Sequence, residues 1–120
     1  FLPDPGVVDY SATKAALANF TKSVSKEFGP HGIRANSISP GPVATDLWLG
    51  AGGVAATVAT ATGANPDAVA DAAAAHAATG RFTTPAEVAN LVAFLASDRV
   101  AGNITGATFT IDGGYSTELH

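Results

Sequence analysis

Two short strand-like runs, separated by more than half of the chain, limit most strongly how these 120 residues fold. The first run is Ile33–Ser39 and the second is Ala107–Asp112, which a pair of glycines follows. The remaining segments have helical patterns, which gives the order α-β-α-α-β of a parallel, doubly wound α/β protein. Because sheets usually hold about four to six strands, two strands predict only part of a three-layer α/β/α domain.

The first helix is predicted over Tyr10 to Phe28. Asp9 and Ser11 are candidate caps at its start, and Gly29-Pro30 is a typical stop signal. Its apolar residues recur at steps of three and four and form one stripe: Ala16, Leu17, Phe20, Val24 and Phe28.

Two further helix starts are visible in the second half of the chain. Asn65-Pro66-Asp67 predicts a helix to about Ala78, with Asn65 as its cap. Thr84-Pro85-Ala86-Glu87 has the pattern of a capping box and predicts a helix to about Ser97. The stretch Leu49 to Gly63 has no charge and no clear apolar period, so we expect a mobile loop or weak helix there.

Composition excludes several classes of function. The net charge of −4 and the lack of a basic run argue against a nucleic-acid partner. No apolar stretch is long enough for a membrane span, so we expect no membrane partner. The chain has no Cys, and its three His are far apart, so no metal site is predicted. A cytoplasmic location is the default expectation.

Tyr10 and Lys14 are the first candidate catalytic residues. Their spacing of four places them on one face of the predicted helix. A tyrosine hydroxyl is a poor acid or base at neutral pH, but an ammonium one turn away favours the phenolate. Such a pair can pass a proton to or from the oxygen of an alcohol or ketone. A plain surface pair has the same spacing.

Further motifs follow this helix in a definite order. They are Gly32-Ile33-Arg34-Ala35-Asn36, Ser39-Pro40-Gly41-Pro42-Val43-Ala44-Thr45, Arg81-Phe82-Thr83-Thr84-Pro85-Ala86-Glu87-Val88-Ala89, and the closing Gly106 to Gly114 strand. Together with the Tyr-x-x-x-Lys helix, they resemble the C-terminal half of the short-chain dehydrogenase/reductase family over nearly the whole chain. The resemblance implies that residues 1–120 are the C-terminal part of one Rossmann-like domain, with residues 47–79 as a substrate-lid insertion.

The resemblance also implies an activity: NAD(P)-dependent interconversion of an alcohol and a ketone by hydride transfer. Tyr10 would be the proton donor or acceptor. Lys14 would activate Tyr10 and bind the ribose hydroxyls of the nicotinamide nucleotide, so both residues would also contact the cofactor. The partner would be a small carbonyl or alcohol substrate, whose identity the sequence does not indicate.

The loop after the first strand would bind the nicotinamide end of the cofactor. Pro40 and Gly41 would shape the floor of the pocket. Val43 would offer backbone groups to the carboxamide, and Thr45 would offer its hydroxyl to the carboxamide or the pyrophosphate. The substrate lid would begin with three residues, of which Trp48 has core packing as an equal alternative: Leu47, Trp48 and Leu49.

Several features of the family are missing from this sequence. The glycine-rich phosphate-binding turn and the residue that selects NAD or NADP are absent, so these two cofactors are not distinguished. The family's catalytic Ser precedes its Tyr, but none of the residues from Phe1 to Asp9 is Ser. With no Met at its start, the chain is expected to be truncated between the cofactor half and the Tyr-Lys half of an enzyme.

Two alternatives stay open beside the oxidoreductase. The chain could be a non-catalytic fragment or oligomerisation module, or a hydrolase on a recycled scaffold of the same family. We expect a homo-oligomer or an association with a separate N-terminal half, because an unpaired sheet edge with apolar faces favours aggregation.

Overall fold

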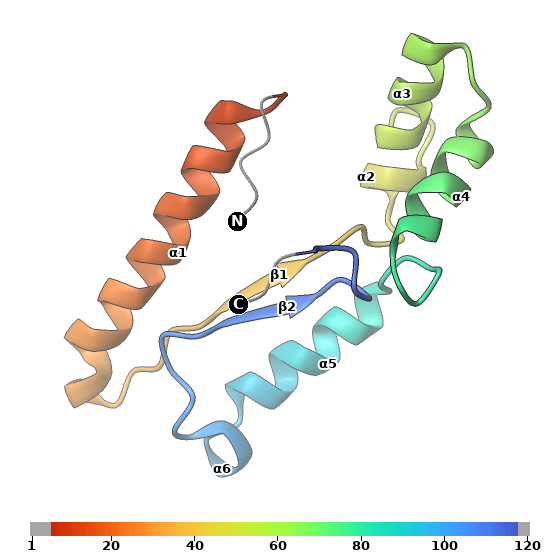
Figure 1. Ribbon diagram of the computed structural model, residues 1–120. Helices are drawn as coiled ribbons and strands as arrows, with labels where there is room; N and C mark the ends of the chain where they lie inside the picture. Colours follow the sequence, from red (N-terminus) through yellow and green to blue (C-terminus); the bar gives the residue numbers. More distant parts are fainter. Residues whose placement is uncertain (1–5, 118–120) are drawn as a thin grey trace. The chain divides into compact units, whose positions relative to one another are not determined.

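The computed structural model describes residues 6–117, and their elements follow the order of an α/β protein (Figure 1). The described chain forms two compact units. The first unit holds residues 6–38 and 92–109, and the second holds residues 39–91 and 110–117. This α/β organisation confirms the predicted fold class, and the sheet is a partial one.

Helix α1 (Val8–Phe28) opens the first unit. It begins earlier than predicted, after the N-cap Val7, whose side chain makes no capping hydrogen bond. The prediction that Asp9 or Ser11 caps this helix is therefore wrong. Asp9 lies in the first turn, where its carboxylate accepts a hydrogen bond from the Tyr10 amide at 2.9 Å. This position also suits its charge, because the N-terminus of a helix favours an anion.

The Gly29-Pro30 stop is confirmed, since α1 ends at Phe28 and a 3-10 turn, η1 (Gly29–His31), follows. Gly29 itself keeps a right-handed helical backbone. The left-handed residue is Gly32, with a φ of 76°, and its amide donates to the Gly29 carbonyl. A glycine suits this position because it has no Cβ to clash in the left-handed region.

The apolar stripe of α1 is largely exposed in the described part of the chain. Leu17 is 54% exposed and Phe20 is 64% exposed. The buried residue of the helix is Ser25, whose hydroxyl donates to the Lys22 carbonyl. The stripe is therefore apolar without belonging to the core of residues 6–117.

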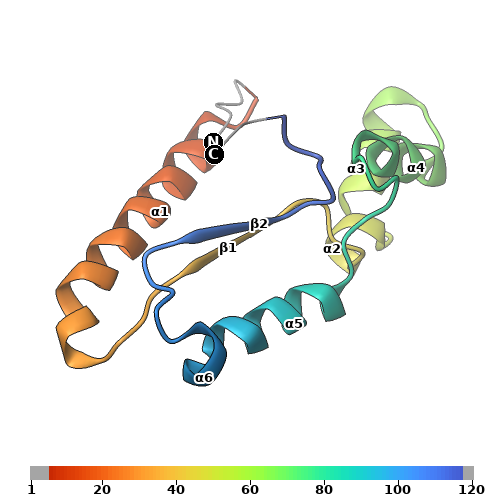
Figure 2. The same ribbon diagram turned by 60° about the horizontal axis from the view of Figure 1, so that its bottom comes forward.

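Strands β1 (Ser37–Pro40) and β2 (Thr108–Ile111) form a two-stranded sheet. The Ser37 amide donates to the Ala107 carbonyl at 2.9 Å, and further along the Gly41 amide donates to the Ile111 carbonyl at 3.1 Å. The register therefore advances in the same direction on both strands, so the pair is parallel, as both views show (Figure 1, Figure 2).

Both strands are shorter than predicted, and side chains explain the late start of β1. The Asn36 amide group donates to the Ile104 carbonyl at 2.8 Å and accepts from the Ala107 amide at 3.1 Å. The Ala35 amide donates to the Thr105 hydroxyl. Besides one backbone bond, from the Gly106 amide to the Ala35 carbonyl at 2.7 Å, these contacts use side chains, and regular strand pairing begins at Ser37.

Three helices form much of the second unit: α2 (Asp46–Leu49), α3 (Val54–Thr62) and α4 (Pro66–His76). The capping prediction at Asn65 is confirmed, because its side chain accepts a hydrogen bond from the Asp67 amide at 2.8 Å. Helix α4 ends before the predicted Ala78. Helices α3 and α4 lie side by side (Figure 1), and the buried apolar residues around them are small: Ala55, Ala59 and Ala77.

The capping box at Thr84 is also confirmed and opens helix α5 (Pro85–Ala96). The Thr84 amide donates to the Glu87 carboxylate at 2.8 Å, and the Glu87 amide donates to the Thr84 hydroxyl at 3.2 Å. A short helix, α6 (Asp98–Ala101), follows; the sequence pattern did not predict it.

Within residues 6–117, no single helix is long and apolar enough to cross a membrane. One pair of segments, Asp46–Thr62 and Pro66–His76, reaches the required length and composition together, with a bend of 109° between them.

Candidate active site

Tyr10 and Lys14 lie one turn apart near the start of α1. The Lys14 Nζ atom is 5.2 Å from the centre of the Tyr10 ring, which is a cation–π distance. Tyr10 is 58% exposed, so its ring is accessible in the described chain. Its backbone carbonyl accepts a hydrogen bond from the Thr13 hydroxyl at 2.8 Å. The ammonium therefore lies against the phenol ring, and the chemical roles of both residues stay predictions.

The second group of predicted site residues, Pro40 to Thr45, belongs to the second unit. Gly41 is closely surrounded there. A Cβ atom on Gly41 would stand 2.6 Å from the Asp112 Cβ and 2.9 Å from the Asp112 Cα. The start of the loop therefore fits against Asp112 only when residue 41 has no side chain, which is a structural reason for glycine at this position.

Val43 forms an isolated parallel bridge with Thr83. The Ala44 amide donates to the Thr83 carbonyl at 2.9 Å, and the Thr83 amide donates to the Pro42 carbonyl at 3.0 Å. In a parallel bridge of this kind, the bonds use the residues on either side of the bridged one. The N–H and C=O of Val43 therefore point to the edge opposite Thr83.

The N–H and C=O of Val43 that face away from Thr83, which we call the Val43 edge, are suited to bind an amide. Its carbonyl accepts a short bond from the Thr45 amide at 2.8 Å and a long one, at 3.4 Å, from the Thr45 hydroxyl, which can rotate toward another acceptor. Within residues 6–117, no acceptor bonds its N–H. One donor and one acceptor at the same residue match the acceptor and donor of a carboxamide group.

Thr45 is the residue before α2. Its carbonyl accepts bonds from the Trp48 amide at 3.0 Å and the Leu49 amide at 2.8 Å, which starts the helix. Its hydroxyl makes only a long contact, at 3.4 Å, with the Val43 carbonyl. The backbone of Thr45 is thus fixed by the helix start, and its side chain lies beside the Val43 edge.

The three predicted lid residues differ in environment. Leu47 is 72% exposed and Leu49 is 51% exposed, and both lie on α2. Trp48 is half-buried, and its ring centre is 5.3 Å from that of Phe82. Packing on Phe82 accounts for Trp48, whereas Leu47 and Leu49 leave apolar surface available to a ligand.

Asp112 lies in the turn that follows β2. Its carboxylate accepts bonds from the Gly114 and Ser116 amides, both at 2.8 Å. Burial acts to raise the pKa of the Asp112 carboxyl, but the bonds from Ser116 and Gly114 outweigh it and hold that pKa below its ordinary value. This carboxylate therefore stabilises the turn as an anion.

No group of three or more His, Asp or Glu side chains that could hold a metal ion occurs within residues 6–117. His31 and His76 are exposed, and His120 lies outside the described residues. His76 packs its ring against Tyr115, with 6.1 Å between the ring centres.

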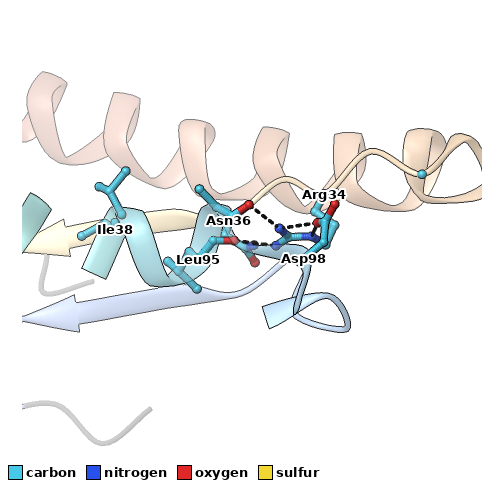
Figure 3. Close-up of a pocket in the computed structure, with 8 residues that line it drawn as sticks. Arg34, Asn36, Ile38, Leu95 and Asp98 are labelled. Atoms are coloured by element: carbon cyan, nitrogen blue, oxygen red, sulfur yellow. Dashed lines mark hydrogen bonds and ion pairs between the residues drawn. The ribbon is translucent and has the colours of Figure 1, made fainter. Parts of the chain in front are cut away.

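A pocket of about 470 Å³ lies in the first unit, with Arg34 in its wall (Figure 3). The Arg34 guanidinium donates to the carbonyls of Leu95, Ala96 and Ile104, and pairs with the Asp98 carboxylate at 2.8 Å. Asn36, also in the wall, is bonded through both ends of its amide. The polar groups of this pocket are thus engaged by the chain itself, which indicates a structural role.

Sequence analysis did not single out Thr83 or Arg34. Both lie within motifs quoted for the family resemblance, but no spacing or periodicity marks them individually. Of the predicted site residues, the structure brings Tyr10 together with Lys14 in the first unit. It brings Gly41, Val43 and Thr45 into one loop of the second unit.

Comparisons with known proteins bear on this arrangement. A family model described as enoyl-(acyl carrier protein) reductase matches residues 3–116. The short-chain reductase protein NovJ of Streptomyces niveus is 38% identical over 109 residues, covering 91% of this chain and 38% of that protein. A 3-oxoacyl-(acyl-carrier-protein) reductase of Synechocystis sp. is 36% identical over 113 residues, covering 92% of this chain and 38% of that protein.

Solved structures of similar proteins also match nearly the whole of this chain. A short chain dehydrogenase family protein from Francisella tularensis has a TM-score of 0.88 and 32% identity, over 98% of this chain and 47% of that one. L-sorbose reductase from Gluconobacter frateurii, complexed with NADPH and L-sorbose, has a TM-score of 0.80 and 34% identity, over 92% of this chain and 41% of that one. The chain therefore spans less than half the length of each of these proteins.

Proposed function

Since its matches cover nearly all of its length, this chain belongs to the short-chain dehydrogenase/reductase family, and we propose that it provides the proton-transfer side of an NAD(P)-dependent oxidoreductase. The relatives it matches are named as reductases or dehydrogenases, among them a 3-alpha-(or 20-beta)-hydroxysteroid dehydrogenase of Mycobacterium tuberculosis. The proposed reaction interconverts an alcohol and a ketone, with hydride passing to or from a nicotinamide cofactor.

The observation that carries this proposal is the Tyr10–Lys14 pair. The two side chains lie on one face of α1, with the ammonium 5.2 Å from the centre of the phenol ring. The Tyr10 ring is 58% exposed, so a substrate can reach it beside the ammonium. In the reducing direction, Tyr10 donates its hydroxyl proton to the carbonyl oxygen as the alcohol forms. In the oxidising direction, the phenolate accepts the proton of the alcohol.

The loop from Gly41 to Thr45 fits the nicotinamide end of the cofactor. When bound, the nicotinamide ring supplies hydride to a carbonyl carbon or receives it from an alcohol carbon. The outward-facing N–H and C=O of Val43 would hold the carboxamide of that ring, with the Thr45 hydroxyl beside them. The proposal assigns only this end of NAD or NADP to the chain.

The test is to mix the purified chain with NADH and, separately, with NADPH, and to follow nicotinamide fluorescence. Turnover is then measured with a 3-oxoacyl thioester, a ketosteroid and L-sorbose, chosen from the names of relatives. Tyr10→Phe should keep cofactor binding and lower turnover by roughly 10²–10⁴-fold, the usual size of a proton-transfer contribution.

Tyr115→Phe is the matched control, because it removes the same hydroxyl group from a tyrosine in the turn after β2, a residue with no role in the proposed proton transfer. It should leave turnover unchanged. If wild type binds neither NADH nor NADPH at millimolar concentration, the proposed function does not hold for this chain. If Tyr10→Phe turns over as fast as wild type, the assignment of Tyr10 is wrong.

The exposed stripe of α1 favours assembly as a second candidate function. Leu17 and Phe20 lie one turn apart and present apolar surface to solvent in the described chain. Burial of such surface against a second copy, or against a separate N-terminal half, would remove it from water. Light scattering decides this point: a stable oligomer without dinucleotide binding supports assembly alone, and a monomer contradicts it.

A further inference from the structure

Thr83 holds the loop that carries the proposed carboxamide site. It is one of the buried polar residues of the described chain, only 7% exposed. Its amide donates to the Pro42 carbonyl, and its carbonyl accepts from the Ala44 amide. Its hydroxyl donates to the Ile111 carbonyl at 3.2 Å. Through three hydrogen bonds, one residue therefore joins the loop after β1 to the end of β2.

The two backbone bonds of Thr83 fix the direction of Val43. They hold the residues on each side of Val43, so its own N–H and C=O are turned to the other edge. If residue 83 rotated or moved away, the Val43 edge would lose the partner that orients it. The orientation of a donor and an acceptor matters because hydrogen bonds weaken steeply with angle.

The hydroxyl bond fixes Thr83 in turn. The Ile111 carbonyl accepts from the Thr83 hydroxyl and also from the Gly41 amide at 3.1 Å. The same carbonyl oxygen at the end of β2 therefore bonds the start of the loop and the residue that holds its middle. A buried hydroxyl without its partner is costly, so this bond selects the side-chain orientation that holds the backbone of residue 83 in place.

The neighbours of Thr83 are anchored as well. Arg81 pairs with Glu87 through two hydrogen bonds, at 2.6 Å and 2.9 Å. The Phe82 ring packs on Trp48, and Thr84 belongs to the capping box of α5. The segment that carries Thr83 is therefore held from both sides, which makes it a firm support for the loop.

We propose that Thr83 is a positioning residue for nicotinamide recognition: it orients the N–H and C=O of Val43 toward the carboxamide without touching the cofactor itself. This inference rests on the proposed function, since it names a support for the same site. It predicts that loss of the Thr83 hydroxyl weakens recognition of the nicotinamide end of the dinucleotide, which is the end that the proposed function assigns to this chain, and has no effect on a ligand without nicotinamide.

The test compares Thr83→Val, which keeps the shape but removes the hydroxyl, with Thr83→Ser, which keeps the hydroxyl. Thr110→Val is the matched control, because Thr110 is exposed on β2. Three quantities are measured for each variant: the dissociation constant for NADH and NADPH, that for ADP-ribose, which lacks nicotinamide, and hydrogen exchange of the Ala44 amide.

Thr83→Val should weaken binding of the reduced dinucleotide by roughly fivefold, the factor expected for one neutral hydrogen bond, with ADP-ribose binding unchanged. Exchange of the Ala44 amide should accelerate by a similar factor. Thr83→Ser should restore both values, and Thr110→Val should match wild type. A purely structural role would accelerate exchange of the Ala44 amide in Thr83→Val and leave its dinucleotide affinity at the wild-type value.

The outcomes separate this inference from the proposed function. If wild type binds dinucleotide and Thr83→Val binds it equally well, the positioning role is overturned while the proposed function stands. If wild type binds neither NADH nor NADPH, the proposed function fails, and the carboxamide role fails with it. In that case Ala44 exchange still decides whether Thr83 holds the loop: an unchanged rate in Thr83→Val refutes it.

Discussion

Replacement of Gly41 by alanine is the most direct test of how the loop is built. The added methyl would stand 2.6 Å from the Asp112 Cβ and 2.9 Å from the Asp112 Cα. Carbon atoms in contact normally lie about 3.5–4.0 Å apart, so the two segments would have to separate by about 1 Å. Gly41 does not have a left-handed φ, so the predicted effect is steric rather than conformational.

The magnitude follows from what would have to move. The Asp112 carboxylate accepts bonds from the Gly114 and Ser116 amides, which fix this turn, so Asp112 does not yield as a flexible side chain would. An inserted methyl group in such a site typically costs about 1–3 kcal/mol. The separation would also stretch the bond from the Gly41 amide to the Ile111 carbonyl. We therefore expect Gly41→Ala to lose about 2 kcal/mol of unfolding free energy.

The assay is urea unfolding followed by circular dichroism, with Gly29→Ala as the matched control. Gly29 has a right-handed helical backbone, and a Cβ there meets no atom within 4 Å. Alanine at Gly29 should leave stability unchanged or raise it by about 0.4–1 kcal/mol. The reasoning would be refuted if Gly41→Ala unfolded at the wild-type urea concentration, or if both variants lost the same stability.

Two further predictions concern the ion pairs. Arg34→Met should lower the free energy of unfolding in urea by about 2 kcal/mol, because charge-assisted bonds to three carbonyls are lost from a side chain that is only 15% exposed. Arg99→Met is the control, since Arg99 is exposed, and it should have no effect. Equal losses in the two variants would contradict the structural role of Arg34. The hydrogen bond from Arg81, and then those from Thr84, lower the pKa of the Glu87 carboxyl to about 2. The stabilising effect of Glu87 is therefore present above the ordinary pKa of 4.5 and is lost as the pH falls toward 2. Unfolding midpoints of wild type and Glu87→Gln should therefore differ most above about pH 4.5 and converge near pH 2; a constant difference would refute this linkage.

Features with local causes could be predicted from the sequence. The Asn65 cap and the Thr84 capping box join residues two or three positions apart, so the sequence pattern contains both partners. The Tyr10–Lys14 contact is also local, since four residues make about one helical turn. The parallel α/β class followed from the order of helices and strands, which needs no knowledge of tertiary contacts.

Features that depend on distant partners could not be predicted. The start of β1 is set by the side chain of Asn36 bonding to residues near Ala107, far along the chain. The cap of α1 was predicted wrongly because an Asp is favoured both at the N-cap and in the first turn of a helix, and the sequence alone does not distinguish the two positions. Gly41 depends on Asp112, and Thr83 on Ile111; neither relation has a period or spacing by which a sequence reveals it.

The contact between α3 and α4 has a consequence for local stability. Apart from the cap residue Ala77, the buried apolar residues around this pair are Ala55 and Ala59, both on α3, and no residue of α4 is buried. Single methyl groups make few dispersion contacts, so little is lost when they meet water. Local opening costs least where few apolar side chains are buried, so we expect the backbone amides of α4 to exchange with solvent before those of α5, which buries Leu95.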